Sequence, residues 1–383
     1  MSLSPEITTA RQQLRDQMPV TEKWAYMDHA AVSPLPRPTS EAIGKWLQQA
    51  TEEGDTVWLD WSAQVQQARK EAAKLINAKT EEIALITSTT AGINIVAEGL
   101  DWNPGDNLVT LDDEFPSNLY PWMHLADRGV ETRQVPTNNG RVNYEKLAEY
   151  FDERTRLITV SWVGYKNGVR RDLETISRIA REKNALLFVD AIQGIGAFPL
   201  DVRKTPIDFL AADGHKWQLG PEGAGFAYIR NDRLPLLRAT GVGWNSVVNA
   251  ADFANVQLEL KPNAARYEGG SQNMAGLIGL SKSLMLLNEI GVERISESIL
   301  EITDDACEAL KTKGAELHTP REGENRSGII SFSLPGIDPV EFRKHCLKNG
   351  VALACRSGRL RISLHGYNDE QDVEKLMRAI ENF

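Results

Sequence analysis

Short apolar runs rich in β-branched residues alternate with segments of helical periodicity along much of this 383-residue chain. The expected strands are residues 83–87, 107–111, 157–161, 185–189, 209–212 and 225–229, and the expected helices are residues 91–99, 119–128, 144–151 and 173–183. Such β-α units fold as a mainly parallel sheet with helices on both faces. Right-handed crossovers bring the carboxyl ends of the strands to one rim, where ligands of such sheets bind. We therefore predict an α/β fold.

The pattern changes near residue 260. A long helix is expected at residues 275–288, continuing into residues 293–311, and a shorter α+β pattern follows, with strands near residues 329–333 and 361–363. We therefore expect a large domain at residues 21–260 and a small domain at residues 261–383, which the N-terminal segment 1–20 joins.

Composition argues against several classes of partner. A formal net charge of −10 and a pI near 5.3 disfavour nucleic-acid binding, which needs a basic patch. The N-terminus lacks the apolar stretch of a secretory signal, and no apolar run is long enough to span a bilayer, so we expect a cytoplasmic protein without membrane contact. The irregular spacing of Cys307, Cys346 and Cys355 suits neither disulfides nor zinc, so we expect reduced thiols and no metal.

A carboxylate and an amine follow two expected strands, Asp190 after the first and Lys216 after the second. Such residues can converge on one ligand, and pyridoxal 5′-phosphate (PLP) needs this pair. The amine forms a Schiff base with the cofactor, and the carboxylate keeps the pyridine nitrogen protonated so that the ring accepts electrons. Gln193 could reach the phenolic oxygen of the ring. Lys216 alone could be a solvated loop lysine, but Asp190 and the glycine-rich residues 220–225 favour the cofactor site.

Hydroxyl side chains lie between the expected strand at residues 83–87 and the expected helix at residues 91–99. They belong to Thr87, Ser88, Thr89 and Thr90. The free N–H groups and the dipole of a helix N-terminus bind anions, and hydroxyl groups add donors. Ordinary helix capping explains the same residues. Beside a PLP site, however, they predict a phosphate site.

Four motifs resemble those of class V aminotransferase-fold enzymes, which are PLP enzymes of fold type I. They are Asp190-x-x-Gln193, Gly214-His215-Lys216, Thr89-Thr90-x-Gly92-Ile93-Asn94 and Arg361-Ile362-Ser363-x-His365-x-Tyr367-Asn368. The chain is most similar to the cysteine desulfurase, selenocysteine lyase and isopenicillin N epimerase-like group. The resemblance runs from Tyr26 to about Asn368 and implies a large domain with a mainly parallel sheet of the seven-stranded type.

The resemblance implies a role for each matching residue around the cofactor ring. Lys216 would hold PLP as a Schiff base and act as the acid-base group at the substrate α-carbon. Asp190 would pair with the pyridine nitrogen, and Gln193 would contact the phenolic oxygen. Phe115 would stack on the ring, where desulfurases usually carry a histidine.

The resemblance also implies how the phosphate is bound. Thr89, Thr90 and His215 would form the phosphate cup. Ser271 would reach the phosphate bound by a partner subunit, so the protein would be a homodimer with shared active sites. We expect Asp213 to point away from this cup, because a carboxylate beside a phosphate is unfavourable.

The substrate side of the site is implied by three further residues. Arg361 resembles the residue that binds the substrate carboxylate, a role that suits a planar bidentate donor. The alternative for Arg361 is an exposed ion pair. His29 and Tyr165 are expected to shape the substrate pocket. Cys355 lies in a strand-like segment without room for the lobe that carries the persulfide-forming cysteine of desulfurases, so we expect it to be inert.

The resemblance leaves the reaction open. After Lys216 removes the α-proton, loss of a β-substituent gives a C–S lyase, whereas reprotonation gives an epimerase or an aminotransferase. We place β-elimination with C–S cleavage first. A nucleotide-binding oxidoreductase is a remote alternative, because the chain lacks Gly-x-Gly-x-x-Gly after the first strand. A non-catalytic protein of this fold would be expected to have lost Lys216 or Asp190.

Overall fold

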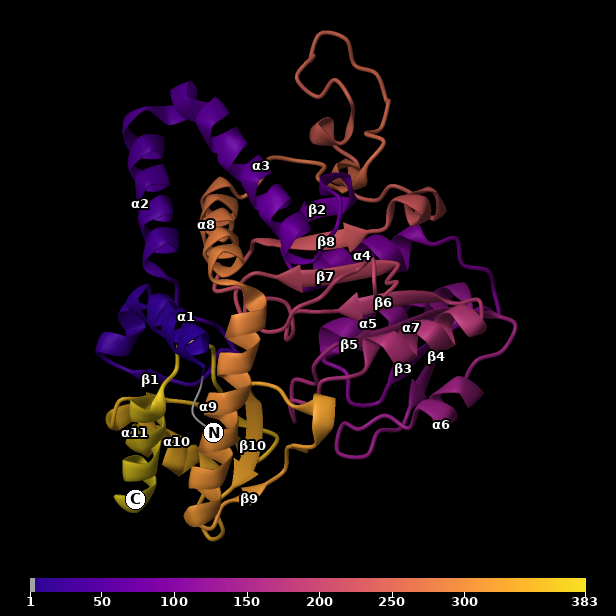
Figure 1. Cartoon of the computed structure of the whole chain (residues 1–383). Helices are drawn as coiled ribbons and strands as arrows, with labels where there is room; N and C mark the ends of the chain where they lie inside the picture. Colours follow the sequence, from indigo (N-terminus) through magenta and orange to yellow (C-terminus); the bar gives the residue numbers. More distant parts are fainter. Residues whose placement is uncertain (1–3) are drawn as a thin grey trace.

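The computed structural model describes residues 4–383, and its largest sheet has seven strands. In spatial order these are β2 (Ile83–Ile86), β8 (Gly225–Ile229), β7 (Phe209–Asp213), β6 (Leu186–Asp190), β5 (Thr155–Ser161), β3 (Asn107–Leu111) and β4 (Glu131–Val135). The strands from β7 to β4 pair in parallel, whereas β8 is antiparallel to both β7 and β2. The expected mainly parallel α/β sheet is confirmed (Figure 1).

Helices cover both faces of this sheet. They include α2 (Arg37–Glu52), α3 (Trp58–Leu75), α4 (Thr89–Gly99), α5 (Tyr120–Met123), α6 (Tyr144–Glu149), α7 (Leu173–Glu182) and α8 (Met274–Ile290). Leu187 and Val189 of β6 pack in the core that contains side chains of α3, α7 and α8. Phe188, between them, packs on the opposite side against Trp122 of α5 and the apolar face of α4. Because both faces are covered, β6 is apolar from Leu186 to Val189, and only its last residue, Asp190, is charged.

Two segments near the sheet edge differ from the expected elements. Residues 119–128 do not form one helix, because α5 ends at Met123 and a 3₁₀ turn continues to Gly129, whose φ of 75° closes the segment. Strand β4 was not predicted, because it lies at the sheet edge and most of its side chains are polar and at least partly exposed. An edge strand needs no continuous apolar run, so hydrophobic periodicity does not reveal it.

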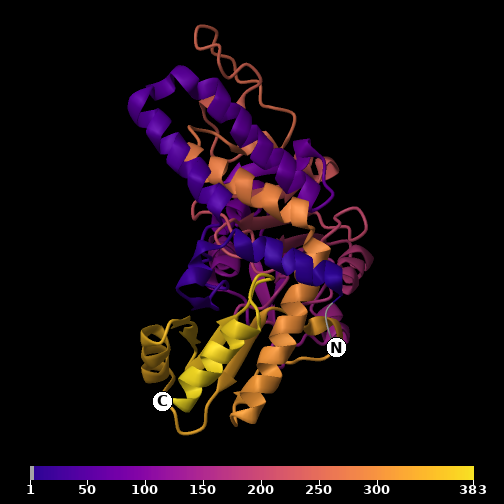
Figure 2. The same ribbon diagram turned by 60° about the vertical axis from the view of Figure 1, so that its left-hand side comes forward.

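A second sheet of four antiparallel strands lies toward the C-terminus. Its spatial order is β12 (Ala354–Arg356), β13 (Arg359–Ser363), β10 (Ile329–Ser333) and β9 (Glu316–Leu317). The remaining elements around it are α1 (Pro5–Asp16), β1 (Ala25–Tyr26), α9 (Val292–Thr312), α10 (Pro339–Lys348), β11 (Val351–Ala352) and α11 (Glu370–Glu381). Strand β1 pairs in parallel with β11, so the N-terminal part of the chain lies beside its C-terminal part (Figure 2).

Helices α8 and α9 meet at Gly291 at an angle of 82°. Helix α8 packs mainly against α2 and α3, which cover the large sheet, whereas α9 packs against α1 and α11. The expected division near residue 260 stays a prediction, and the change of packing partners falls at Gly291. Within residues 4–383, no single helix is long and apolar enough to cross a bilayer, although the bent pair α8–α9 reaches that length and apolarity together.

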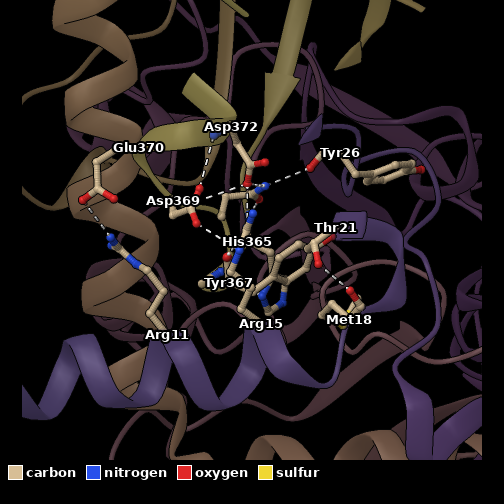
Figure 3. Close-up of polar contacts among 12 residues, drawn as sticks. Arg11, Arg15, Met18, Thr21, Tyr26, His365, Tyr367, Asp369, Glu370 and Asp372 are labelled. Atoms are coloured by element: carbon tan, nitrogen blue, oxygen red, sulfur yellow. Dashed lines mark hydrogen bonds and ion pairs between the residues drawn. The ribbon is translucent and has the colours of Figure 1, made fainter. Parts of the chain in front are cut away.

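Ion pairs connect α1 to the turn that follows β13 and to the first turn of α11 (Figure 3). The guanidinium of Arg15 contacts the carboxylates of Asp369 and Asp372, each at 2.9 Å, and donates to the carbonyl oxygen of Tyr367 at 3.0 Å. Asp372 also accepts a hydrogen bond from Asn368 at 2.9 Å. A partly buried Arg15 with three acceptors holds this turn in one conformation.

Arg15→Gln should lower the free energy of unfolding by about 2 kcal/mol, because it removes charged hydrogen bonds from the buried carboxylate of Asp372. Arg378→Gln is the matched control, since Arg378 forms an exposed i,i+4 pair with Glu374 and should cost less than about 0.5 kcal/mol. Urea unfolding measures both variants. Equal losses in the two would contradict a stabilising role for Arg15.

Candidate active site

A cavity of about 450 Å³ lies where β6 and β7 end, and β13 approaches it from the second sheet. Most of the predicted site residues line it, namely Thr89, Thr90, Phe115, Tyr165, Asp190, Gln193, His215, Lys216 and Arg361. The structure therefore brings together residues that are far apart in the sequence. His29 and Ser271 do not line this cavity.

Asp190 is buried and Lys216 is partly buried, and both line the cavity. Asp190 is the last residue of β6 and pairs with Ala211 of β7, so the loop after β7 returns Lys216 to the same rim. Burial, reinforced by the nearby carboxylate of Glu114, raises the pKa of Asp190 to about 7. Burial also lowers the pKa of Lys216 to about 8, although the charge of Asp190 opposes this shift. A lysine with such a pKa has a substantial neutral, nucleophilic fraction near neutral pH.

The amide of Gln193 is oriented by two protein groups. Its Oε1 accepts a hydrogen bond from Nε1 of Trp217 at 2.8 Å, and its Nε2 donates to the carbonyl oxygen of Ala30 at 3.0 Å. The second N–H of this amide is left for the cavity that Gln193 lines. A ligand beside Gln193 therefore meets a hydrogen-bond donor.

The hydroxyl and imidazole groups of the predicted phosphate cup lie beside the N-terminus of α4. Ser88 caps this helix by accepting from the N–H of Ala91 at 3.1 Å, and α4 begins at Thr89. Gly92 permits close packing here, because a Cβ at this position would lie 2.5 Å from Cβ of Ala211 on β7. The free N–H groups of the first turn and the hydroxyls of the cavity suit an anion.

The expectation that Asp213 points away from this cup is wrong, because Asp213 lines the cavity. One carboxylate oxygen accepts from the N–H of Gly214 at 2.8 Å, and the other lies 2.8 Å from Nδ1 of His215. Its backbone N–H donates to Oγ1 of Thr89 at 3.0 Å. The carboxylate can lie beside the cavity because both of its oxygens have a hydrogen-bond partner in the protein.

Arg361 is buried to 2% exposure and extends from β13 to the cavity. Its Nη1 donates to the carbonyl oxygen of Tyr165 at 2.9 Å, and its Nη2 lies 3.3 Å from the carboxylate of Asp28. Nε of Arg361 is buried and has no hydrogen-bond partner within residues 4–383. Burial lowers the pKa of Arg361. A buried donor without an acceptor suits a ligand carboxylate.

Phe115 and the residues behind it were only partly anticipated. The ring of Phe115 is half-exposed at the cavity, 5.7 Å from Nζ of Lys216, and meets Tyr165 edge to face. The preceding Glu114 is fully buried and accepts from the N–H of Ser161 at 2.8 Å and from Arg171 at 2.9 Å. The pair of Glu114 and Arg171 was not predicted, because no local pattern links residues so far apart.

His29 does not line the cavity, although the next residue, Ala30, does, and Ser271 lies outside it. His29 is fully buried, with Nδ1 2.8 Å from the carbonyl oxygen of Ser363 and Nε2 2.8 Å from the hydroxyl of Tyr367. Ser271 lies at a different hollow, which it shares with Glu268. Arg356 and Glu222 line the cavity and were not predicted. Arg356 shares a face with Arg361 only because the β12–β13 hairpin pairs it with Arg359, a register that no local pattern in the sequence shows.

The segment that carries Cys355 forms a tight hairpin. Strands β12 and β13 are joined by Ser357 and Gly358, which both have positive φ, 51° and 73°. Cys355 pairs with Leu360, a residue of the core of the second sheet, whereas the neighbouring pair is Ala354 with Arg361. Because side chains alternate along a strand, Cys355 and Arg361 lie on opposite faces of this sheet.

The residues of the cavity fit PLP. PLP supplies an aldehyde for an amine and a ring that withdraws electrons from the substrate α-carbon. Lys216 offers the amine, Asp190 a buried carboxylate, and Gln193 a hydrogen-bond donor. Together with an anion-binding helix N-terminus, these groups define a PLP-dependent enzyme on an α/β fold.

Residues 25–376 match the family of aminotransferase class-V enzymes, and the chain belongs to this family. It is 32% identical to a probable cysteine desulfurase of Methanothermobacter thermautotrophicus over 96% of both chains. The apo structure of a cysteine desulfurase from Thermococcus onnurineus superposes with a TM-score of 0.88, at 26% identity and 97% coverage of both chains. The cystine C–S lyase C-DES, with a TM-score of 0.89 and 23% identity over 96% of this chain and 100% of its own, shares the fold.

Asp190→Asn should change the pH dependence of stability in the cofactor-free protein. The pKa of Asp190 is about 7 when folded, against an ordinary value of 3.8, so ionisation favours the unfolded state. The wild type therefore loses stability through this group as the pH rises from about 4 to 7. We expect the variant to gain at least about 1 kcal/mol relative to wild type between pH 5 and 7.5.

Urea unfolding at the two pH values measures this difference. Asp55→Asn, at an exposed carboxylate, serves as the control and should follow the wild type. Identical pH slopes for Asp190→Asn and wild type would refute the assignment of a raised pKa to Asp190.

Proposed function

We propose that this enzyme cleaves the C–S bond of a sulfur-containing amino acid by β-elimination, without a persulfide-forming cysteine. Two observations support the absence of a persulfide-forming cysteine. The turn between β12 and β13 has only two residues, and Cys355 lies on the face of the sheet opposite Arg361. The family and its desulfurase-named relatives support sulfur-containing amino acids as the substrate class.

The proposed role of each residue follows from the atoms that it can offer to a ligand in the cavity. Arg361 binds the substrate carboxylate through its unpartnered Nε, which orients the α-carbon toward Lys216. Lys216 removes the α-proton, for which a pKa of about 8 is suitable. Asp190 would stabilise the positive charge of the cofactor nitrogen, and Phe115 would pack against the ring. Tyr165 lies beside Phe115 at the substrate side.

The phosphate is proposed to lie at the start of α4. Thr89 and Thr90 contribute hydroxyl groups there, and His215 contributes an imidazole that Asp213 holds at 2.8 Å. This assignment is supported by the free N–H groups of the first turn of α4, which can donate hydrogen bonds to an anion.

We also propose a homodimer in which Ser271 acts in the active site of the partner. Ser271 lies outside the cavity of its own chain, and its loop is anchored by Glu268, whose carboxylate contacts Arg69 at 2.5 and 2.8 Å. The nearby segment 242–260 exposes Phe253, Val256 and other apolar side chains, as a surface covered by a second subunit would. The cytoplasmic location stays a prediction.

Incubation of the PLP-loaded enzyme with L-cysteine tests the proposed reaction. We expect pyruvate and free sulfide in equal amounts, and Cys355→Ser should keep more than about half of the wild-type rate because the thiol faces away from Arg361. Alanine as the carbon product, with loss of activity in Cys355→Ser, would establish a persulfide route instead. Transfer of the amino group or inversion at the α-carbon would move the assignment to transamination or epimerisation.

Lys216→Ala tests the attachment of the cofactor. In the wild type, borohydride should fix PLP covalently to Lys216, and peptide mass spectrometry should locate it there. The variant should lose this adduct and at least about 1000-fold of its activity, because both the amine and the base are removed. Lys166→Ala is a suitable control, since Lys166 does not line the cavity. A borohydride-reducible lysine adduct in Lys216→Ala would refute the assignment.

A further inference from the structure

The orientation of the Gln193 amide decides what the cavity offers to a ligand. A glutamine can present either a carbonyl oxygen or N–H groups, and these bind opposite kinds of atom. The indole N–H of Trp217 can only donate, and the carbonyl oxygen of Ala30 can only accept. A flipped amide would therefore face Trp217 with a donor and Ala30 with an acceptor, losing both hydrogen bonds of 2.8 and 3.0 Å. Gln193 is fixed as a donor toward the cavity.

Trp217 is itself held by a residue that follows β13. Nε2 of His365 donates to the carbonyl oxygen of Trp217 at 3.1 Å, and the two rings stack with centroids 5.7 Å apart. Nδ1 of His365 accepts from the N–H of Gly366 at 2.8 Å, so the imidazole is neutral with its proton on Nε2. Burial lowers the pKa of His365 to about 4, which preserves this arrangement at neutral pH.

The opposite end of the Gln193 amide is held through His29 and Ser363. Nδ1 of His29 donates to the carbonyl oxygen of Ser363, and Nε2 of His29 accepts from the hydroxyl of Tyr367. The hydroxyl of Ser363 accepts from the N–H of Ala30 at 2.9 Å. Ala30, whose carbonyl oxygen receives the Gln193 N–H, and the preceding His29 are therefore held by residues that end β13 or follow it. Both partners of Gln193 depend on the same turn.

We infer that Trp217 is a positioning residue for the cofactor, because it makes Gln193 present an N–H group to the phenolic oxygen of the ring. The inference rests on the proposed contact between Gln193 and PLP. A donor at this place favours the oxygen in its anionic form and opposes a protonated oxygen, which would also need an acceptor. Packing alone does not require the indole nitrogen, since a phenyl ring fills most of the same buried volume.

Trp217→Phe tests the inference in the PLP-loaded enzyme, because it keeps a buried ring and removes the N–H. The Gln193 amide then loses the partner of its oxygen and can turn. We expect the pH midpoint of the visible absorption band to move and PLP to dissociate about five-fold more readily, as one lost hydrogen bond costs about 1 kcal/mol. Trp102→Phe is the matched control, since buried Trp102 donates to the carbonyl oxygen of Ala97 at 2.8 Å and does not line the cavity. The control should lose comparable stability without moving the band.

A double-mutant cycle with Gln193→Leu separates positioning from packing. If Trp217 acts through Gln193, then Trp217→Phe shifts the band in the wild type and has little effect in the Gln193→Leu background. Equal shifts in both backgrounds would overturn the inference, although a borohydride-reducible adduct at Lys216 would still support the proposed function. An unchanged band in Gln193→Leu alone would refute the Gln193 contact and the inference with it.

A second replacement guards against a folding defect in Trp217→Phe. Exchange of Trp217 for 3-benzothienylalanine keeps the bicyclic shape and replaces the N–H with sulfur. We expect this variant to shift the visible absorption band as Trp217→Phe does. A wild-type band in the folded variant would overturn it, because only the hydrogen-bond donor has been removed.

Discussion

The pairing of β6 with β7 is the constraint on which the active site depends. Asp190 lies opposite Ala211 in adjacent parallel strands, so the loop that leaves β7 carries Lys216 back over the same rim. Burial then acts on both groups, raising the pKa of Asp190 and lowering that of Lys216. Neither charge is well solvated in the cofactor-free protein. A ligand with a cationic ring nitrogen would pair with Asp190, and its aldehyde would react with the amine of Lys216. The burial that disfavours the charged forms of Asp190 and Lys216 therefore also suits both groups to bind PLP.

The second sheet completes this site from the opposite side. Arg361 reaches the cavity from β13, and the turn that follows β13 supplies the hydrogen bonds that fix His29 and Trp217. Arg15 of α1 holds that turn through Asp369 and Asp372 (Figure 3). His29, Trp217 and Arg361 are therefore all positioned by β13 or by the turn that follows it.

Much of the large sheet could be predicted from the sequence because its central strands are buried on both faces. Such strands are short apolar runs, and they stand out between helical segments. Strand β4 did not follow this rule, since it lies at the edge and most of its side chains are polar and partly exposed. Asp213 was misjudged for a different reason. Its carboxylate lines the cavity because His215 and Gly214 satisfy it, and such pairing is a property of side-chain geometry rather than of residue type.

The sequence by itself determined the fold class, the family resemblance and the groups that can do chemistry. Lys216, Asp190, Gln193 and the hydroxyls before α4 are recognisable because each follows a strand or opens a helix, and local periodicity encodes those positions. The tertiary structure alone decided how the polar atoms of the site residues are paired. It oriented the Gln193 amide, left Nε of Arg361 without a hydrogen-bond partner among residues 4–383, and placed Cys355 on the face of the second sheet opposite Arg361. These outcomes depend on hydrogen bonds and strand register between residues up to several hundred positions apart, and no local pattern in the chain records them.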